Sequence, residues 1–139
     1  MNNQKSEIFH FFVAKLLYIT KRARLDIEIT VSYLCTRVSK STQDDWKRLR
    51  RVLGFLQNTI DDVRIIGADS LQNLFTWGDA AYGVHSQDTR SHTGAVMSMG
   101  TGDIHQRSTK QKLNVKSSTE AQIVGTSEYV PYNVWMQKI

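Results

Sequence analysis

The sequence predicts an α+β protein in which a basic helical segment precedes a small antiparallel sheet and one further helix. Apolar residues recur at helical spacing up to about residue 56, and short β-rich runs separated by Gly, Ser and Asp follow a turn at 58–62. The charge divides at the same place, because residues 1–60 hold 11 Lys or Arg against 5 Asp or Glu, and residues 61–139 hold 7 against 8. We therefore divide the chain into a helical segment, 1–60, and a second unit, 61–139.

Three elements are expected in the helical segment. Residues 7–20 read as a helix that ends near a cluster of cations at 21–24, and residues 26–38 fit both a strand and a helix, so their state stays open. The third element is a helix for which Ser41 or Thr42 serves as N-cap, since two acids follow in the first turn. Its apolar stripe consists of Trp46, Leu49, Val52, Leu53 and Leu56.

The second unit reads as a three-stranded meander followed by a helix. Runs 72–79, 93–99 and 103–110 are β-rich and are joined by polar turns near 86–91 and 100–102, which is typical of antiparallel hairpins. Ser117 and Glu120 then form a capping-box pattern at the start of a helix. Pro131 has no amide hydrogen to donate, so we expect a break or a kink there.

Composition favours a soluble globular chain. Hydrophobic residues make up 40% and charged residues 22% of the 139 residues, and a lone Cys35 has no internal disulfide partner, which favours a reducing compartment. The most apolar early run, 8–19, is interrupted by His10 and Lys15. It reads as a buried amphipathic helix and not as a membrane span, so no membrane partner is expected.

Three segments together resemble one family. They read WGDAAYG (77–83), SHTGAVMSMG (91–100) and QRSTKQKLNVKSSTEAQIVG (106–125). In this order and at these distances they resemble the ribonuclease H domain at the C-terminus of copia-type retrotransposon polyproteins. Residues 14–59 resemble the thumb and connection region that follows the polymerase palm in the same polyproteins. The resemblance implies a helical reverse transcriptase segment followed by a truncated ribonuclease H-like unit with an open strand edge.

The resemblance also implies a chemistry. Enzymes of this family hydrolyse the RNA strand of RNA–DNA hybrids with two Mg²⁺ ions held by carboxylates, and Asp79 and Glu120 match the first two ligands. The family's third and fourth carboxylates lie on a later strand and helix, so we expect Mg²⁺ binding by this chain to be weak or absent and cleavage to be slight or absent. The alternative, purely structural roles are helix capping for Glu120 and a turn at the end of a strand for Asp79.

Basic residues indicate a nucleic-acid partner. Lys47, Arg48 and Arg51 lie off the apolar stripe of the third helix, and a second group precedes the last helix: Lys110, Lys112, Lys116 and Ser117. We expect an RNA–DNA hybrid or another nucleic acid as partner, together with the rest of the polymerase polyprotein. A non-catalytic nucleic-acid-binding module is the alternative function, and a merely solvated face is the alternative for each basic residue.

Further expectations concern the remaining ring side chains and the location. His85, His92 and His105 are read as surface or turn residues, whereas Trp77 and Trp135 are read as core. The family resemblance implies an intracellular protein, in cytoplasmic virus-like particles or in the nucleus.

Overall fold

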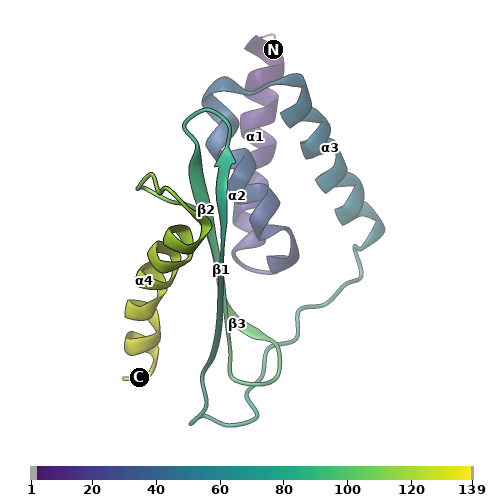
Figure 1. Cartoon of the computed structure of the whole chain (residues 1–139). Coiled ribbons are helices and arrows are strands. Elements are labelled where there is room, and N and C mark those ends of the chain that lie inside the picture. The colour runs from purple at the N-terminus through teal and green to yellow at the C-terminus, as the bar shows by residue number, and fades with distance from the viewer. Residues whose placement is uncertain (1–2, 139) are drawn as a thin grey trace. The chain divides into compact units, whose positions relative to one another are not determined.

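The computed structural model describes residues 3–138 and divides into two compact units, Met1–Arg64 and Ile65–Ile139. The first unit contains α1 (Asn3–Thr20), η1 (Leu25–Ile27), α2 (Glu28–Arg37), η2 (Val38–Lys40) and α3 (Gln43–Asn58), where η denotes a short 3₁₀ helix. The second unit contains β1 (Phe75–His85), β2 (Arg90–Ser98), β3 (Asp103–Lys110) and α4 (Ser118–Met136) (Figure 1). The α+β class expected from the sequence is confirmed.

The first unit is held together by an apolar core to which all three long helices contribute. Its members are Phe9, Val13, Leu16, Ile27, Val31, Leu34, Leu49 and Val52. Residues 26–38, left open between strand and helix, are helical. Burial of Val31 and Leu34, three residues apart on one helical face, accounts for the choice, because a strand would direct them to opposite sides.

The start of α3 agrees with its prediction. The Thr42 hydroxyl accepts a hydrogen bond from the Asp45 amide at 3.3 Å, and the Asp45 carboxylate accepts one from the Thr42 amide at 2.9 Å, which completes a capping box. Burial of Asp45 opposes its ionisation, but the hydrogen bonds from Thr42 and the charge of Arg37 outweigh this and hold the pKa of Asp45 below its usual value.

The second unit contains the predicted antiparallel meander, in the order β1-β2-β3. However, β1 is longer than the expected run 72–79 and continues to His85, since Ala80 and Ala81 pair with Thr93 and His92. Asp79 therefore lies inside β1, opposite Gly94, and its interpretation as a strand-end turn residue is wrong. Within this sheet β1 is an edge strand.

Helix α4 packs on the sheet mainly along β1, where small residues permit a close approach (Figure 1). A Cβ atom added at Gly125 would lie 2.9 Å from Thr93 Cγ2 and 3.5 Å from the Ala80 Cβ. Of the break or kink expected at Pro131, the break is wrong, because α4 is continuous from Ser118 to Met136. Proline removes the hydrogen bond that its own nitrogen would have donated and crowds the carbonyl four residues earlier, and α4 accommodates both effects while it packs on the sheet.

The ring side chains also differ from expectation. His85 and His92 are buried, with exposed fractions of 4% and 8%, and their Nε2 and Nδ1 atoms lie 3.0 Å apart in a hydrogen bond. His92 Nε2 is in turn 2.7 Å from Ser108 Oγ, so these polar rings satisfy one another. Trp77 and Trp135 are 57% and 61% exposed, so the prediction that they belong to the core is wrong.

Candidate metal and nucleic-acid site

Asp79 is exposed on β1 and reaches helix α4 through a single hydrogen bond. Its Oδ1 atom accepts from Gln122 Nε2 at 2.6 Å and from the Ala80 amide at 2.8 Å. Its Oδ2 atom has no hydrogen-bond or ion-pair partner among the interactions of residues 3–138. The carboxylate is thus positioned by two amide donors while one oxygen stays available.

Glu120 lies in the first turn of α4 and is held in a similar way. Its Oε2 atom accepts from the Lys116 amide at 2.7 Å, and its own amide donates to the Ser117 hydroxyl at 3.2 Å. Ser117 is therefore the N-cap, as predicted, but the reciprocal bond goes to the residue before the cap. Capping engages only one of the two carboxylate oxygens of Glu120.

The two predicted metal ligands lie on elements that pack together, but they are not directly linked. Asp79 is bonded to Gln122, two residues beyond Glu120 on α4. Within the described part of the chain, no group of three or more His, Cys, Asp or Glu side chains is arranged to hold a metal ion. The structure therefore brings Asp79 against α4, the helix on which Glu120 lies.

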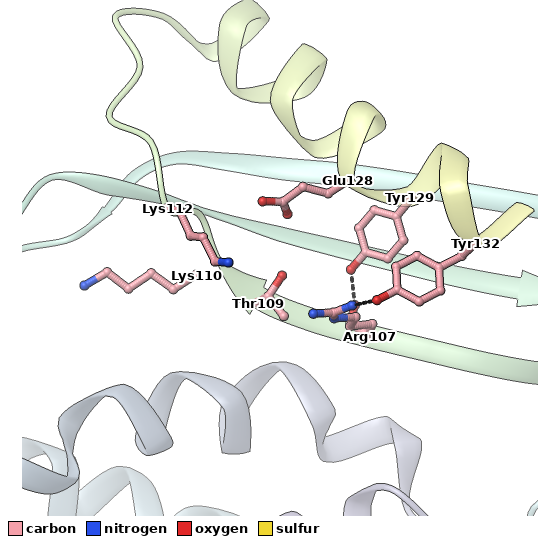
Figure 2. A pocket seen from close by; sticks show the side chains of 7 residues that line it. All are labelled: Arg107, Thr109, Lys110, Lys112, Glu128, Tyr129 and Tyr132. Carbon is pink, nitrogen blue, oxygen red and sulfur yellow. Dashed lines mark hydrogen bonds between the residues drawn. The ribbon is translucent and has the colours of Figure 1, made fainter.

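A second feature is a pocket of about 340 Å³ between β3 and α4, here called the β3–α4 pocket (Figure 2). It contains two of the predicted nucleic-acid contacts, Lys110 and Lys112. Its lining consists of Arg107, Thr109, Lys110, Lys112, Glu128, Tyr129 and Tyr132. Three cations against one carboxylate make the lining positive.

Two tyrosines of α4 fix the Arg107 side of this pocket. Tyr129 donates to the Arg107 carbonyl at 3.0 Å, and the Arg107 guanidinium donates to the Tyr132 hydroxyl and lies 5.2 Å from the centre of its ring (Figure 2). Burial raises the pKa of Tyr129 to about 12, although the Arg107 charge and the Thr109 hydrogen bond oppose the shift. Tyr129 therefore remains a neutral donor across the physiological range.

The other predicted contacts in the second unit have mixed roles. Lys110 Nζ lies 2.6 Å from Asp88 Oδ2, which offsets part of its charge. Lys116 is exposed, and its carbonyl accepts a hydrogen bond from the Tyr82 hydroxyl at 3.1 Å. The Ser117 hydroxyl caps α4, so its oxygen is already an acceptor. Lys112 is exposed and makes no ion pair with the residues that the structure describes.

On α3 the three predicted cations separate. Arg48 and Arg51 line a shallow hollow of about 350 Å³ with Asp26 and Phe55, whereas Lys47 lies outside it and pairs with Asp44 at 3.0 Å. Arg48 also lies 5.0 Å from the centre of the Tyr33 ring. Two of the three predicted positions therefore share one surface.

Sequence reasoning missed Gln122, Arg107, Tyr129 and Tyr132. The two tyrosines are three residues apart on α4, and Arg107 and Thr109 alternate along β3, so both pairs share a face of their element. That spacing was a usable signal. No sequence signal predicted the contact between Asp79 and Gln122, because this contact depends on where α4 packs against β1.

The fold is thus a small antiparallel sheet with one packed helix, preceded in the chain by a three-helix unit, and its candidate site combines acidic and basic side chains. The chain is 32% identical over 99 residues to a retrovirus-related Pol polyprotein from transposon RE2 of Arabidopsis thaliana, covering 71% of this chain and 7% of the relative. It is 24% identical over 127 residues to the Pol polyprotein from transposon TNT 1-94 of Nicotiana tabacum, covering 91% and 9%. These similarities relate the chain to a short stretch of retrotransposon Pol polyproteins.

Another relative is comparable to this chain in length. The secreted RxLR effector protein 161 of Plasmopara viticola is 27% identical over 124 residues, which is 89% of this chain and 87% of that protein. No family model matches the chain. No solved structure matches it. None of the described helices is both long enough and apolar enough to cross a membrane.

Proposed function

We propose that Ile65–Ile139 is the first part of a ribonuclease H-like domain of a copia-type Pol polyprotein, and that Asp79 and Glu120 bind a divalent cation there. The observation that carries this proposal is the hydrogen bond between Asp79 in β1 and Gln122 in α4. It ties the first expected ligand to the first turns of the helix that contains the second. On this proposal the preceding helices are the thumb and connection segment, and the protein works inside the cell.

The donor set suits Mg²⁺ in its chemistry. Mg²⁺ prefers carboxylate oxygens and keeps several waters, and Asp79 and Glu120 each have one oxygen without a partner among residues 3–138. A cation bound there would polarise a phosphate and a water molecule. Because the described acidic groups form no larger cluster, we expect weak binding and little or no hybrid cleavage by this chain in isolation.

Exposed apolar side chains support the rest of the polyprotein as the partner. On α4, Ile123, Val130 and Val134 are 65%, 48% and 45% exposed, and they recur at helical spacing. The outer edge of β1 also pairs with no strand of this sheet. An uncovered apolar stripe and an open strand edge each suit the attachment of further protein.

The experiment measures metal binding and activity separately. Mn²⁺ is titrated into the full chain as a paramagnetic substitute for Mg²⁺, and the NMR signals of amides near Asp79 and Glu120 are expected to broaden first. Asp79→Asn should abolish this broadening, whereas Asp103→Asn, in β3, should not. Broadening that is equal in both variants would contradict the site. Robust cleavage of the hybrid by the unmodified chain that disappears in Asp79→Asn would contradict the expected inactivity but would leave the metal site standing.

A second candidate function is non-catalytic nucleic-acid binding. Arg48 and Arg51 share one hollow of the helical unit, and this favours a basic contact surface on α3. Binding of an RNA–DNA hybrid should then weaken steeply with salt and survive the double change Asp79→Asn and Glu120→Gln. Salt-independent binding would reject this candidate.

A further inference from the structure

We propose that the β3–α4 pocket binds a backbone phosphate of a nucleic-acid strand, with Arg107 and Lys112 as its cationic contacts. The inference deepens the proposed function and rests on it for the choice of nucleic acid as the ligand. It adds a binding site that is distinct from the two carboxylates. The pocket volume of about 340 Å³ lies near the lower limit of ligand pockets, which suits one phosphate and its sugar.

The charges at the pocket favour an anion. Neither Arg107 nor Lys112 has a carboxylate within salt-bridge distance in the described part of the chain, whereas Lys110 is already paired with Asp88. Arg107 is also pre-positioned, because the Tyr132 hydroxyl accepts from its guanidinium and the Tyr132 ring lies beside it. A positioned guanidinium loses little further freedom on binding phosphate.

The aromatic side chains of the pocket are arranged to hold the cation and not to stack on a base. The Tyr132 ring stacks with His105 at 5.9 Å between ring centres, and the Arg107 guanidinium lies over the same ring. Tyr129 is buried and its hydroxyl is bonded to the Arg107 carbonyl. We therefore expect phosphate recognition with no base preference at this pocket.

Substitution of Glu128 tests the site in the direction opposite to substitution of Lys112, because it is expected to strengthen phosphate binding. Its carboxylate extends from α4 toward Lys112 at the same pocket (Figure 2). A negative charge at a phosphate site weakens binding by repulsion. Removing it should therefore strengthen binding, while removing Lys112 should weaken it, and both changes affect side chains at the surface of the fold.

The experiment compares three side-chain substitutions in the full chain: Lys112→Gln, Glu128→Gln, and Lys138→Gln as a control. Lys138 is an exposed lysine of the same unit that does not line the pocket. Binding of a fluorescein-labelled RNA–DNA hybrid should weaken about three- to tenfold in Lys112→Gln and strengthen by a similar factor in Glu128→Gln. Lys138→Gln should change affinity by less than about twofold.

Titration with inorganic phosphate locates the site independently. The NMR amide signals of Arg107, Thr109 and Lys112 are expected to shift first in the unmodified chain. Hybrid binding to which all three variants respond alike would overturn the pocket and leave the proposed function standing. Shifts at the pocket without any hybrid binding would support the phosphate site and contradict the proposed nucleic-acid role. Phosphate shifts that lie elsewhere would overturn the inference.

Discussion

The two units of this chain are stabilised in different ways. The helical unit buries a continuous set of large apolar side chains, from Phe9 to Val52. In the second unit small and polar residues lie where the helix meets the sheet, namely Ala121 and Gly125 on α4 and Ala80 and Thr93 on the strands. The fully buried Gln111 donates to Thr93 Oγ1 at 2.7 Å and to the Ala121 carbonyl at 2.9 Å. Stability of the helical unit therefore depends on the volume of its buried apolar side chains, whereas stability of the second unit depends on close packing of small residues and on buried hydrogen bonds.

The largest effect is expected in the apolar core of the helical unit. Phe9→Ala should destabilise it by about 4 kcal/mol, because a fully buried ring is replaced by a cavity. Phe11→Ala is the matched control, since Phe11 is 55% exposed on the same helix, and it should cost less than about 1 kcal/mol. Urea unfolding followed by circular dichroism measures both. Equal losses would show that the core is not where stability resides.

The second unit should respond to acid. The pKa of His92 is lowered from 6.5 to about 4, mainly by burial and further by the charges of His85 and Lys110. Because the unfolded chain binds this proton at higher pH, stability is complete above about 6.5 and is lost as the pH falls toward about 4. The loss is on the order of 3 kcal/mol.

Hydrogen exchange of β2 amides at pH values on either side of this range measures that loss. The acid dependence should largely disappear in His92→Gln, which can still bond to Ser108, and it should persist in His10→Gln, where the exposed imidazole lies on α1. If His92→Gln keeps the full acid dependence, another group is responsible.

The same substitution should have opposite signs in the two units. Gly125→Ala should destabilise by about 2 kcal/mol, since its Cβ would meet Thr93 Cγ2 at 2.9 Å and Thr93 is held by Gln111. Gly54→Ala in α3 meets nothing within 4 Å and should stabilise by about 0.5–1 kcal/mol through helix propensity. Thermal unfolding of both variants measures the difference. A stabilising Gly125→Ala would show that the close contact is relaxed in solution.

The smallest expected difference concerns the helix caps. Thr42→Ala should cost about 1–1.5 kcal/mol, because it breaks a complete capping box around the buried Asp45. Ser117→Ala should cost about 0.5–1 kcal/mol, since Ser117 makes one exposed capping bond. Chemical denaturation of each variant compares the two. The reverse order would mean that Asp45 is held mainly by Arg37 and not by the cap.

Local patterns predicted much of this protein. Thr42 and Asp45 lie three residues apart, and Gly100 and Gly102 have positive φ values of 117° and 75° in the turn between β2 and β3. Such features depend on residues that are close in sequence, so they can be predicted without knowledge of the tertiary structure. The three strands and their order followed from the same kind of signal.

Other features depended on distant contacts. The helical state of residues 26–38 depends on the burial of Val31 and Leu34 in the same core as Phe9 and Leu49. Burial of His92 depends on hydrogen bonds with two distant residues, His85 and Ser108. The exposure of Trp77 was missed because a large aromatic side chain is usually buried, whereas here it stacks on Phe75 at 6.1 Å on an edge strand.

The candidate site shows the same division. By itself the sequence determined the residue types, two carboxylates and a set of cations, because the identity of each side chain is read directly from the sequence. Only the tertiary structure decided which of them meet: Asp79 with Gln122, and Arg107 with Tyr132, while Lys47 stayed apart from Arg48 and Arg51. The packing of α4 on the sheet determines the first two contacts, and that packing depends on close approaches such as Gly125 to Thr93, which no local pattern encodes.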